Sequence, residues 1–287
     1  MKRNLGDWMD LWLEVYVKPT KAINTYANYC DAAQRLFRVF PDWENAEMDQ
    51  LTNLTVQEAF NFMGELYAKN TLNHIRVALR GAYKTAIKNG VFLENPVIDI
   101  EIPSYASSRT VPSLSISEQK MVEEASLSDP LGHITVFLLN TGLRANELMN
   151  LKKEHYIAKH NYIVIPKSKT KAGERIVPLV PIAKEILLMK LYRGESDYMF
   201  TSTKGTPVSK TVLRKLCIRT RQKTGLDFLT NHVYRHTFAT RLVENQVDYK
   251  ALAELLGHTD VAFTLNRYPR IHHEFLSQQI NLLGNNR

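Results

Sequence analysis

The chain has 287 residues, of which 44% are hydrophobic and 23% charged, a composition typical of a soluble globular protein with room for two domains. No apolar stretch approaches transmembrane length, and charged residues and tryptophans stand where a signal peptide needs an unbroken apolar run. A formal net charge of +8 favours an anionic partner, most commonly nucleic acid. The two cysteines, Cys30 and Cys217, are interpreted as buried thiols in a reducing compartment. We therefore predict a cytoplasmic protein without a membrane association.

Hydrophobic residues recur at helical spacing through the first part of the chain, which predicts a small all-α domain over residues 1–96. Pro19 separates the first helix from the second. A capping box of Thr55 and Glu58 is expected to open the third helix. The expected helices span residues 4–18, 22–40, 55–69 and 71–89.

The fourth helix carries a basic stripe, because cationic residues recur every four positions and no acidic residue interrupts them. A solvated charged face is the simpler interpretation of such a pattern, but a salt-bridged surface helix would mix the two signs of charge. A helix of this kind fits the major groove of DNA, with its cations on the flanking phosphates. The predicted DNA-binding residues are Arg76, Arg80, Lys84 and Lys88.

Residues 97–113 lack a helical period and contain Pro103, Pro112 and several serines, so we interpret them as a linker. The second domain is predicted over residues 114–287. It begins with a capping box of Ser115 and Glu118, followed by a nearly all-apolar helix over about 131–140 that is typical of a buried core helix.

The sequence TGLRANEL follows that buried helix and places one arginine beside a tight turn. Gly142 permits the turn, and Arg144 lies in the first turn of a new helix, where exposed backbone N–H groups favour a phosphate oxygen. Glu147, one turn further on, is placed to orient the guanidinium group. Taken alone, Arg144 is more simply a surface cation.

Two segments with alternating β-branched residues, 162–166 and 175–179, predict a β-hairpin. Its connecting segment carries Lys167, Lys169 and Lys171. Such lysines are commonly solvated, but a lysine on a hairpin can also reach over a phosphate and donate a proton. Helices are expected over about 182–191 and 210–221, the second of them basic.

The stretch from residue 230 to residue 270 contains four side chains suited to chemistry on a phosphodiester. His232 can exchange a proton near neutral pH, and Arg235 offers a charged fork of donors that matches phosphate oxygens. His258, in an L-G-H turn, can donate a further hydrogen bond. Tyr268 can act as a covalent nucleophile.

R-x-x-E on a helix, a lysine hairpin, H-x-x-R-H, L-G-H and a downstream tyrosine stand in this order, and the chain thereby resembles the tyrosine recombinase family of phage integrases and Xer-type recombinases. The motifs cover about residues 113–287, and the first domain matches the family's helical core-binding domain only in architecture. In the hairpin Lys169 matches best, with Lys167 and Lys171 as alternatives. The resemblance assigns the catalytic positions to Arg144, Lys169, His232, Arg235, His258 and Tyr268.

The resemblance also implies the fold, the partners and the reaction. It predicts a mainly α protein with a small β-sheet (α+β), double-stranded DNA as partner, a homotetramer on paired DNA sites and, as a further partner, an accessory directionality factor. No cofactor is called for, because a 3′-phosphotyrosine intermediate retains the bond energy and religation then needs no ATP. No metal is called for either, because the sequence has no G-x-x-x-x-G-K-[ST] loop and no clear carboxylate cluster of the two-metal nuclease kind. Compared with integrases of the lambda type, we expect the chain to lack an additional arm-binding amino-terminal domain.

Three hypotheses for the function remain open from the sequence. The first is a site-specific recombinase that integrates or excises a mobile element, or an Xer-like resolvase of DNA dimers. The second is an enzyme similar to a type IB topoisomerase, without synapsis of two sites, and the third is a catalytically idle DNA-binding regulator. Apolar residues at near-helical spacing after Tyr268, from Ile271 to Leu282, favour the first, because they resemble a tail that docks on a neighbouring protomer.

Overall fold

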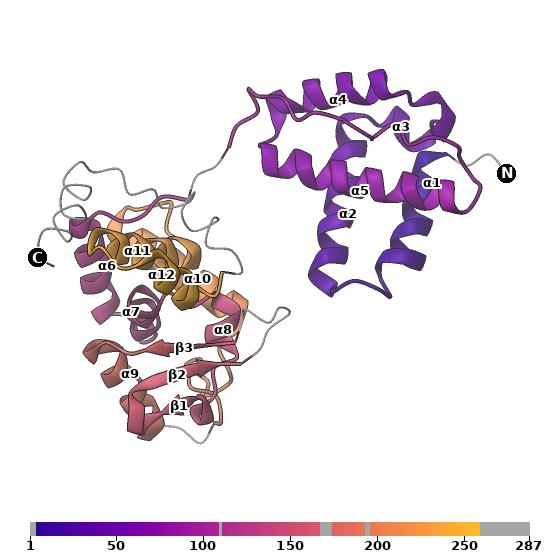
Figure 1. Ribbon diagram of the computed structural model, residues 1–287. Coiled ribbons are helices and arrows are strands. Elements are labelled where there is room, and N and C mark those ends of the chain that lie inside the picture. Colours follow the sequence, from indigo (N-terminus) through magenta and orange to yellow (C-terminus); the bar gives the residue numbers. More distant parts are fainter. Residues whose placement is uncertain (1–3, 109–110, 167–173, 193–195, 259–287) are drawn as a thin grey trace, which may run out of the picture. The chain divides into compact units, whose positions relative to one another are not determined.

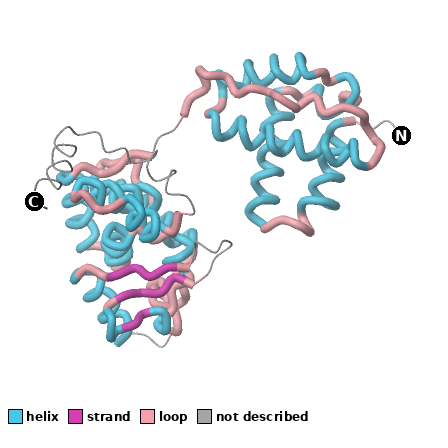
Figure 2. Tube along the Cα trace, in the orientation of Figure 1, coloured by secondary structure: helices cyan, strands magenta, loops and turns pink. Residues whose placement is uncertain are grey.

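The structure is a computed structural model that describes residues 4–108, 111–166, 174–192 and 196–258. The chain divides into two compact units, Met1–Thr110 and Val111–Arg287. The fold is mainly α-helical with one small antiparallel sheet, which confirms the predicted fold class (Figures 1 and 2). None of the helices in the described ranges is both long and apolar enough to cross a membrane.

The first unit is all-helical, and its core forms where α2 and α1 pack against α5. The inward positions of α5, among them Leu72, Ile75 and Leu79, are buried as the periodicity predicts. Tyr83 and Phe60 are among the largest fully buried side chains of this core. The elements are α1 (Leu5–Trp12), the π-helical turn η1 (Leu13–Val17), α2 (Ile23–Val39), α3 (Asp42–Asn45), η2 (Met48–Gln50), α4 (Asn53–Leu66) and α5 (Lys69–Lys88).

The start of α4 differs from the prediction. The helix begins at Asn53, and the cap is Thr52, whose side chain accepts a hydrogen bond from the backbone N–H of Thr55. The predicted capping box of Thr55 and Glu58 is therefore wrong. Thr52 has the extended backbone that a cap requires, whereas Thr55 already lies within the first turn.

Residues 95–107, which we call the strap, pack on the first unit although their composition predicts a linker. Val97, Ile100 and Ala106 are buried in the core of this unit. The side-chain amide of Gln57 on α4 both donates to the carbonyl of Glu101 and accepts from its N–H, at 3.0 and 2.9 Å. Most of the predicted linker 97–113 thus belongs to the first compact unit, because polar side chains satisfy a backbone that forms no regular element.

The second unit places helices around a three-stranded antiparallel sheet of order β1-β2-β3. In the hairpin β2–β3, Ile165 pairs with Arg175 and Tyr162 with Pro178, which confirms the predicted hairpin. The elements are α6 (Ile116–Leu127), α7 (Gly132–Thr141), α8 (Ala145–Met149), η3 (Lys153–His155), β1 (Tyr156–Ile157), η4 (Ala158–His160), β2 (Tyr162–Ile165), β3 (Arg175–Pro178), α9 (Pro181–Tyr192), α10 (Lys210–Thr224), α11 (Asn231–Glu244) and α12 (Tyr249–Leu256).

The buried helix α7 organises this second unit. It packs against α6, α9 and α11, and its residues Ile134, Phe137 and Leu138 are completely buried, as predicted. The capping box of Ser115 and Glu118 that opens α6 is confirmed. Helix α12 packs against both α11 and β3, so the end of α12 lies where the sheet and the helical layer meet (Figure 1).

Candidate active site

The turn after α7 places the first of the predicted phosphate-binding arginines. Gly142 has a φ of 62° and ends α7 in the left-handed conformation, and Arg144 follows as the N-cap of α8. The guanidinium group of Arg144 donates from Nη1 to Glu147 Oε1 at 2.8 Å and from Nη2 to the carbonyl of Gly257 at 2.9 Å. Glu147 thus orients Arg144, as the spacing predicts.

Glu147 lies between two arginines. Besides the hydrogen bond from Arg144, its carboxylate accepts hydrogen bonds from Nη1 and Nη2 of Arg175, each at 2.8 Å. This bidentate geometry is the strongest arrangement of an arginine and a carboxylate. Burial alone would raise the pKa of the Glu147 carboxyl, but the hydrogen bonds and the charge of Arg175 outweigh it, together with those from Arg144. The net effect lowers the pKa of Glu147 to about 2, so the carboxylate stays ionised.

Arg175 is a functional candidate that is not among the residues predicted from the sequence. It is the first residue of β3, its side chain is only 2% exposed, and its Nε donates to the carbonyl of Leu255 at 2.8 Å. A usable signal exists in the sequence. Glu147 lies on a helix next to a buried region, and a buried carboxylate needs a cationic partner. Arg175 stands next to Ile176 at the start of a half-buried strand, where alternate side chains face the interior.

Arg235 comes from α11 and is 5% exposed. Its Nη1 donates to the carbonyl of Gly142 at 2.7 Å, and its Nη2 donates to the carbonyl of Leu256. The same Nη2 lies 3.2 Å from Nε2 of His258. The arginine therefore joins the turn after α7 to the end of α12, and the structure brings Arg144, Arg235 and His258 together.

The carboxyl end of α12 collects all three arginines. The last carbonyls of a helix have no partner within it, and the helix dipole makes this end negative. Here the backbone carbonyls of Leu255, Leu256 and Gly257 accept hydrogen bonds from Arg175, Arg235 and Arg144, respectively. The positive charges of the three arginines thus outweigh the negative potential at the end of the helix and make this a site suited to an anion.

Gly257 is required by this arrangement. It has a φ of 62°, a conformation that residues with a Cβ rarely adopt, and a Cβ placed there would lie 2.9 Å from Nη1 of Arg175. The glycine of the L-G-H turn therefore allows the close approach of an arginine. It also aims the next residue, His258, back toward Arg235.

His258 is neutral in this environment. Burial, followed by the charges of Arg235, Arg144 and Arg175, lowers the pKa of His258 to about 4. Because an arginine has only donors, Nε2 of His258 must accept from Arg235, and the proton of the neutral ring is then on Nδ1.

The remaining predicted residues are placed as follows. His232 lies in the first turn of α11, one turn before Arg235, on the exposed side of the helix. Tyr234 between them is completely buried, as expected of a residue that packs in the core. Lys169 and Tyr268 lie outside the described residues, as do Lys167 and Lys171.

We predict that the stability of the protein falls as the pH is lowered from 7 to 5, and that His258→Gln reduces this fall. The pKa of His258 is about 4 in the folded chain, against about 6.5 for an unperturbed histidine. Between these two pH values the unfolded chain binds more protons than the folded chain. The contribution of His258 to the free energy of unfolding is therefore fully present above about pH 6.5 and is lost as the pH falls toward 4. Burial lowers the pKa of His133 to about 4 as well, so His133→Phe should act in the same direction.

Thermal unfolding midpoints measured at several pH values check this expectation. The range above pH 5 avoids the titration of carboxylates such as Glu147. A variant His258→Gln whose melting temperature falls as steeply as that of the wild type would contradict it.

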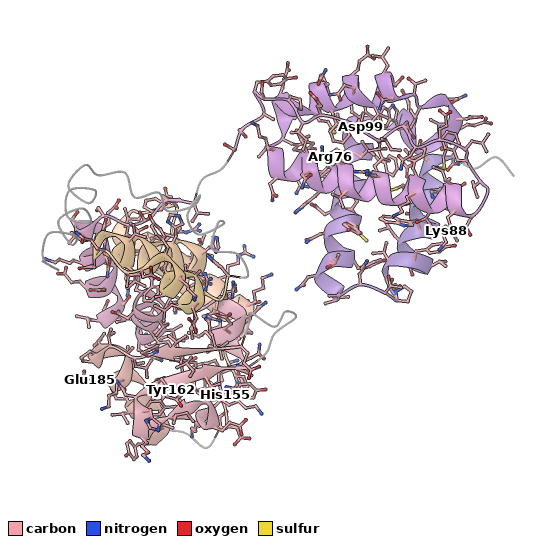
Figure 3. The ribbon with its side chains drawn as sticks, in the orientation of Figure 1. Arg76, Lys88, Asp99, His155, Tyr162 and Glu185 are labelled. Carbon is pink, nitrogen blue, oxygen red and sulfur yellow. The ribbon has the colours of Figure 1, made fainter. Side chains whose placement is uncertain are left out.

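The predicted DNA-binding stripe lies on α5 of the first unit and divides into two kinds of residue. Arg80, Lys84 and Lys88 are exposed. Arg76 is half-buried, and its Nη1 donates to the carbonyl of Ile100 at 2.8 Å, next to Asp99 of the strap (Figure 3). Arg76 therefore fastens the strap, a task that the four-residue spacing does not distinguish from phosphate binding.

Comparisons with known proteins identify the family of the chain. The model of the family described as the Phage integrase family matches residues 117–274, more than half of the chain. A protein named "Tyrosine recombinase XerC-like" from Caldanaerobacter subterraneus is 26% identical over 313 residues, which cover 93% of this chain and 79% of that protein.

Solved structures show the same fold. The Tn1549 transposon integrase in complex with transposon right end DNA has a TM-score of 0.77 at 18% identity, covering 98% of this chain and 100% of that chain. A lambda integrase tetramer bound to a Holliday junction has a TM-score of 0.76 at 23% identity, covering 95% of this chain and 80% of that chain.

These findings define the class of protein. The chain belongs to the phage integrase family. It is a tyrosine recombinase, an enzyme that breaks and rejoins DNA strands.

Proposed function

We propose that this protein is a site-specific recombinase that integrates or excises a mobile DNA element, with Arg144, Arg235 and His258 holding the scissile phosphate. The observation that carries the proposal is the convergence of these three side chains at the end of α12. A phosphodiester resists attack because its negative charge repels the nucleophile, and charge grows further in the transition state. Fixed donors around the non-bridging oxygens lower that barrier, and here the two arginines are charged while His258 is neutral.

Tyr268 is the proposed nucleophile. A tyrosine hydroxyl has a pKa of about 10 and attacks poorly while it is protonated. His232, on the exposed side of α11, accepts the phenolic proton, and the arginines favour the phenolate. The phenolate oxygen forms a bond to phosphorus, the bond from phosphorus to the 5′ oxygen breaks, and Lys169 donates a proton to that leaving oxygen. The products are a 3′-phosphotyrosine and a free 5′ hydroxyl, which attacks in the reverse step to rejoin the strand.

The cellular role has two candidates with different support. The fold shared with the integrase of a transposon supports the integration or excision of a mobile element. The relatives that are named XerC and XerD support an Xer-like resolution of DNA dimers. An enzyme similar to a type IB topoisomerase, which acts on one site without synapsis, is the remaining alternative.

The proposed assembly is a homotetramer on two paired DNA sites, acting in the cytoplasm. A lambda integrase of the same fold forms a tetramer on a Holliday junction, and strand exchange between two duplexes requires four cleaving subunits. An accessory directionality factor would favour excision over integration.

Two assays test these proposals. The cleavage sites are first mapped on the DNA that flanks the gene, and a plasmid with two copies of the mapped site is then incubated with the protein. Recombination of the two sites, with a covalent protein–DNA adduct as intermediate, is expected. Relaxation of plasmid DNA without recombination would support the topoisomerase alternative, and binding without any adduct would support an idle regulator.

We also propose that the exposed part of the α5 stripe binds DNA phosphates, and we predict that Arg80→Ala and Lys84→Ala each weaken binding to the mapped site. Each variant should reduce the slope of log K against log salt by about 0.9, the value for one lost phosphate contact. Lys21→Ala, which removes one exposed charge from the same unit outside α5, is the matched control and should retain the wild-type slope. Slopes equal to that of the wild type in all three variants would show that the stripe faces solvent.

A further inference from the structure

We propose that Arg175 is a positioning residue for DNA cleavage, because it fixes Glu147 and the end of α12 and thereby sets the positions of Arg144 and His258. The inference rests on the proposed function, since it requires Arg144 and His258 to act on the scissile phosphate. Arg175 itself makes no contact with the phosphate. It acts through Glu147 and the end of α12, the two groups that it holds.

The first link runs through Glu147. Its Oε1 accepts from Nη1 of Arg175 and from Nη1 of Arg144, both at 2.8 Å. The side chain of Arg175 is 2% exposed and that of Glu147 is 8% exposed, whereas the side chain of Arg144 is 41% exposed. An exposed arginine has many rotamers of similar energy, so the buried pair, and not packing around Arg144, selects the rotamer that faces the site.

The second link runs through the last turn of α12. Nε of Arg175 donates to the carbonyl of Leu255. Its Nη1 is so close to Gly257 that a Cβ on this glycine would lie only 2.9 Å from it. Arg175 thus packs against the turn that contains Gly257, whose carbonyl binds Arg144, and His258. A shift of Arg175 would move both groups together.

The third link joins this site to the hairpin. Arg175 is the first residue of β3 and pairs with Ile165, the last residue of β2. The segment between these two residues contains Lys169, the proposed proton donor. Through its backbone and its side chain together, Arg175 therefore connects the hairpin, Glu147 of α8 and the end of α12.

Stability alone does not account for this pair. Replacing a buried ion pair by apolar side chains of similar volume is often neutral or stabilising, because desolvation of the two charges offsets their attraction. What an apolar pair cannot do is orient Arg144. Catalytic geometry tolerates little error, and a displacement of about 1 Å can lower a rate by about 10²-fold.

The test uses the full chain and a DNA duplex that carries the mapped cleavage site, with a nick beside the scissile phosphate that traps the covalent adduct. Arg175→Lys keeps the charge, and Arg175→Met removes it while retaining much of the side-chain volume. For both variants we expect the single-turnover rate of adduct formation to fall by about 10²-fold or more, with a much smaller change in the Kd for the same DNA. Rates are expressed per DNA-binding molecule, so a partly unfolded preparation does not mimic the effect.

Arg219 provides the matched control. It forms a bidentate pair with Asp129 at 2.6 and 3.0 Å, in the same unit, between α10 and the connection from α6 to α7. Arg219→Lys and Arg219→Met should lower the melting temperature but leave the rate of adduct formation per DNA-binding molecule unchanged. An equal loss of rate in the Arg219 and Arg175 variants would show that Arg175 contributes only stability.

A double-mutant cycle identifies the route. If Arg175 acts mainly through Glu147, the double variant Arg175→Met, Glu147→Gln forms adduct no more slowly than the slower single variant. Rate losses that multiply in the double variant would overturn this coupling. Adduct formation at the wild-type rate in both Arg175 variants would overturn the inference while leaving the proposed function intact, whereas a wild-type protein without adduct would reject the proposed function itself.

Discussion

Tyr268→Phe is expected to abolish the covalent protein–DNA adduct while leaving site-specific DNA binding nearly unchanged. The substitution removes one hydroxyl group and keeps the aromatic ring, so the size and apolar character of the side chain change little. Without the hydroxyl no phosphotyrosine can form, and the cationic side chains around the phosphate still hold the DNA. The expected loss is therefore complete, not partial.

The measurement is denaturing electrophoresis of a labelled duplex with the mapped site after incubation with the protein. Binding of the same duplex is followed in parallel by a mobility shift. Tyr249→Phe, at the start of α12, is the control substitution of the same type. Adduct at the wild-type yield in Tyr268→Phe, or its loss in Tyr249→Phe alone, would reject Tyr268 as the nucleophile.

The helical framework follows from periodicity, because burial of an apolar face is a local property of a segment. The inward face of α5 and the all-round apolar helix α7 are both read correctly from spacing alone. The predicted cap of α4 was wrong because two nearby threonines compete for the same position. Both Thr52 and Thr55 have a side-chain oxygen suited to capping, and the backbone conformation that chooses Thr52 depends on how the preceding turn packs.

The strap shows what composition cannot predict. Proline and serine suggest a free linker, but residues 95–107 find their hydrogen-bond partners on α4 and α5, through Gln57 and Arg76. These partners are more than twenty positions away in the chain, so no local pattern indicates them. The same limit applies to Arg76, whose spacing matches the stripe while its guanidinium group binds the strap.

The candidate site is predictable in its composition and not in its geometry. The order of the motifs names Arg144, Arg235 and His258, but their meeting point at the end of α12 depends on tertiary packing. Arg175 is missed because an arginine at the start of a short strand is usually exposed. Only the structure shows that it is buried against Glu147 and the last turn of α12, which ends at Gly257.

Arg235→Lys is expected to lower the rate of adduct formation by about 10²- to 10³-fold, the usual loss when one fixed donor to a developing anion is removed. Arg235 holds the carbonyls of Gly142 and Leu256 with two different nitrogens while it approaches His258. A lysine keeps the charge but has a single nitrogen, which cannot reach both carbonyls and a phosphate oxygen at once.

The same substitution should also destabilise the fold by about 1–3 kcal/mol, because a buried carbonyl loses its donor. Arg241 separates this effect from catalysis. It lies on the same helix, α11, and its Nη2 donates to the carbonyl of Leu114 at 2.7 Å, so Arg241→Lys should cost stability of a similar kind. Single-turnover adduct formation and thermal unfolding of the two variants distinguish the roles. A loss of rate confined to Arg235→Lys would place the guanidinium group of Arg235 on the phosphate. Equal rates in the two variants, with equal losses of stability, would show that Arg235 only stabilises the packing of α12.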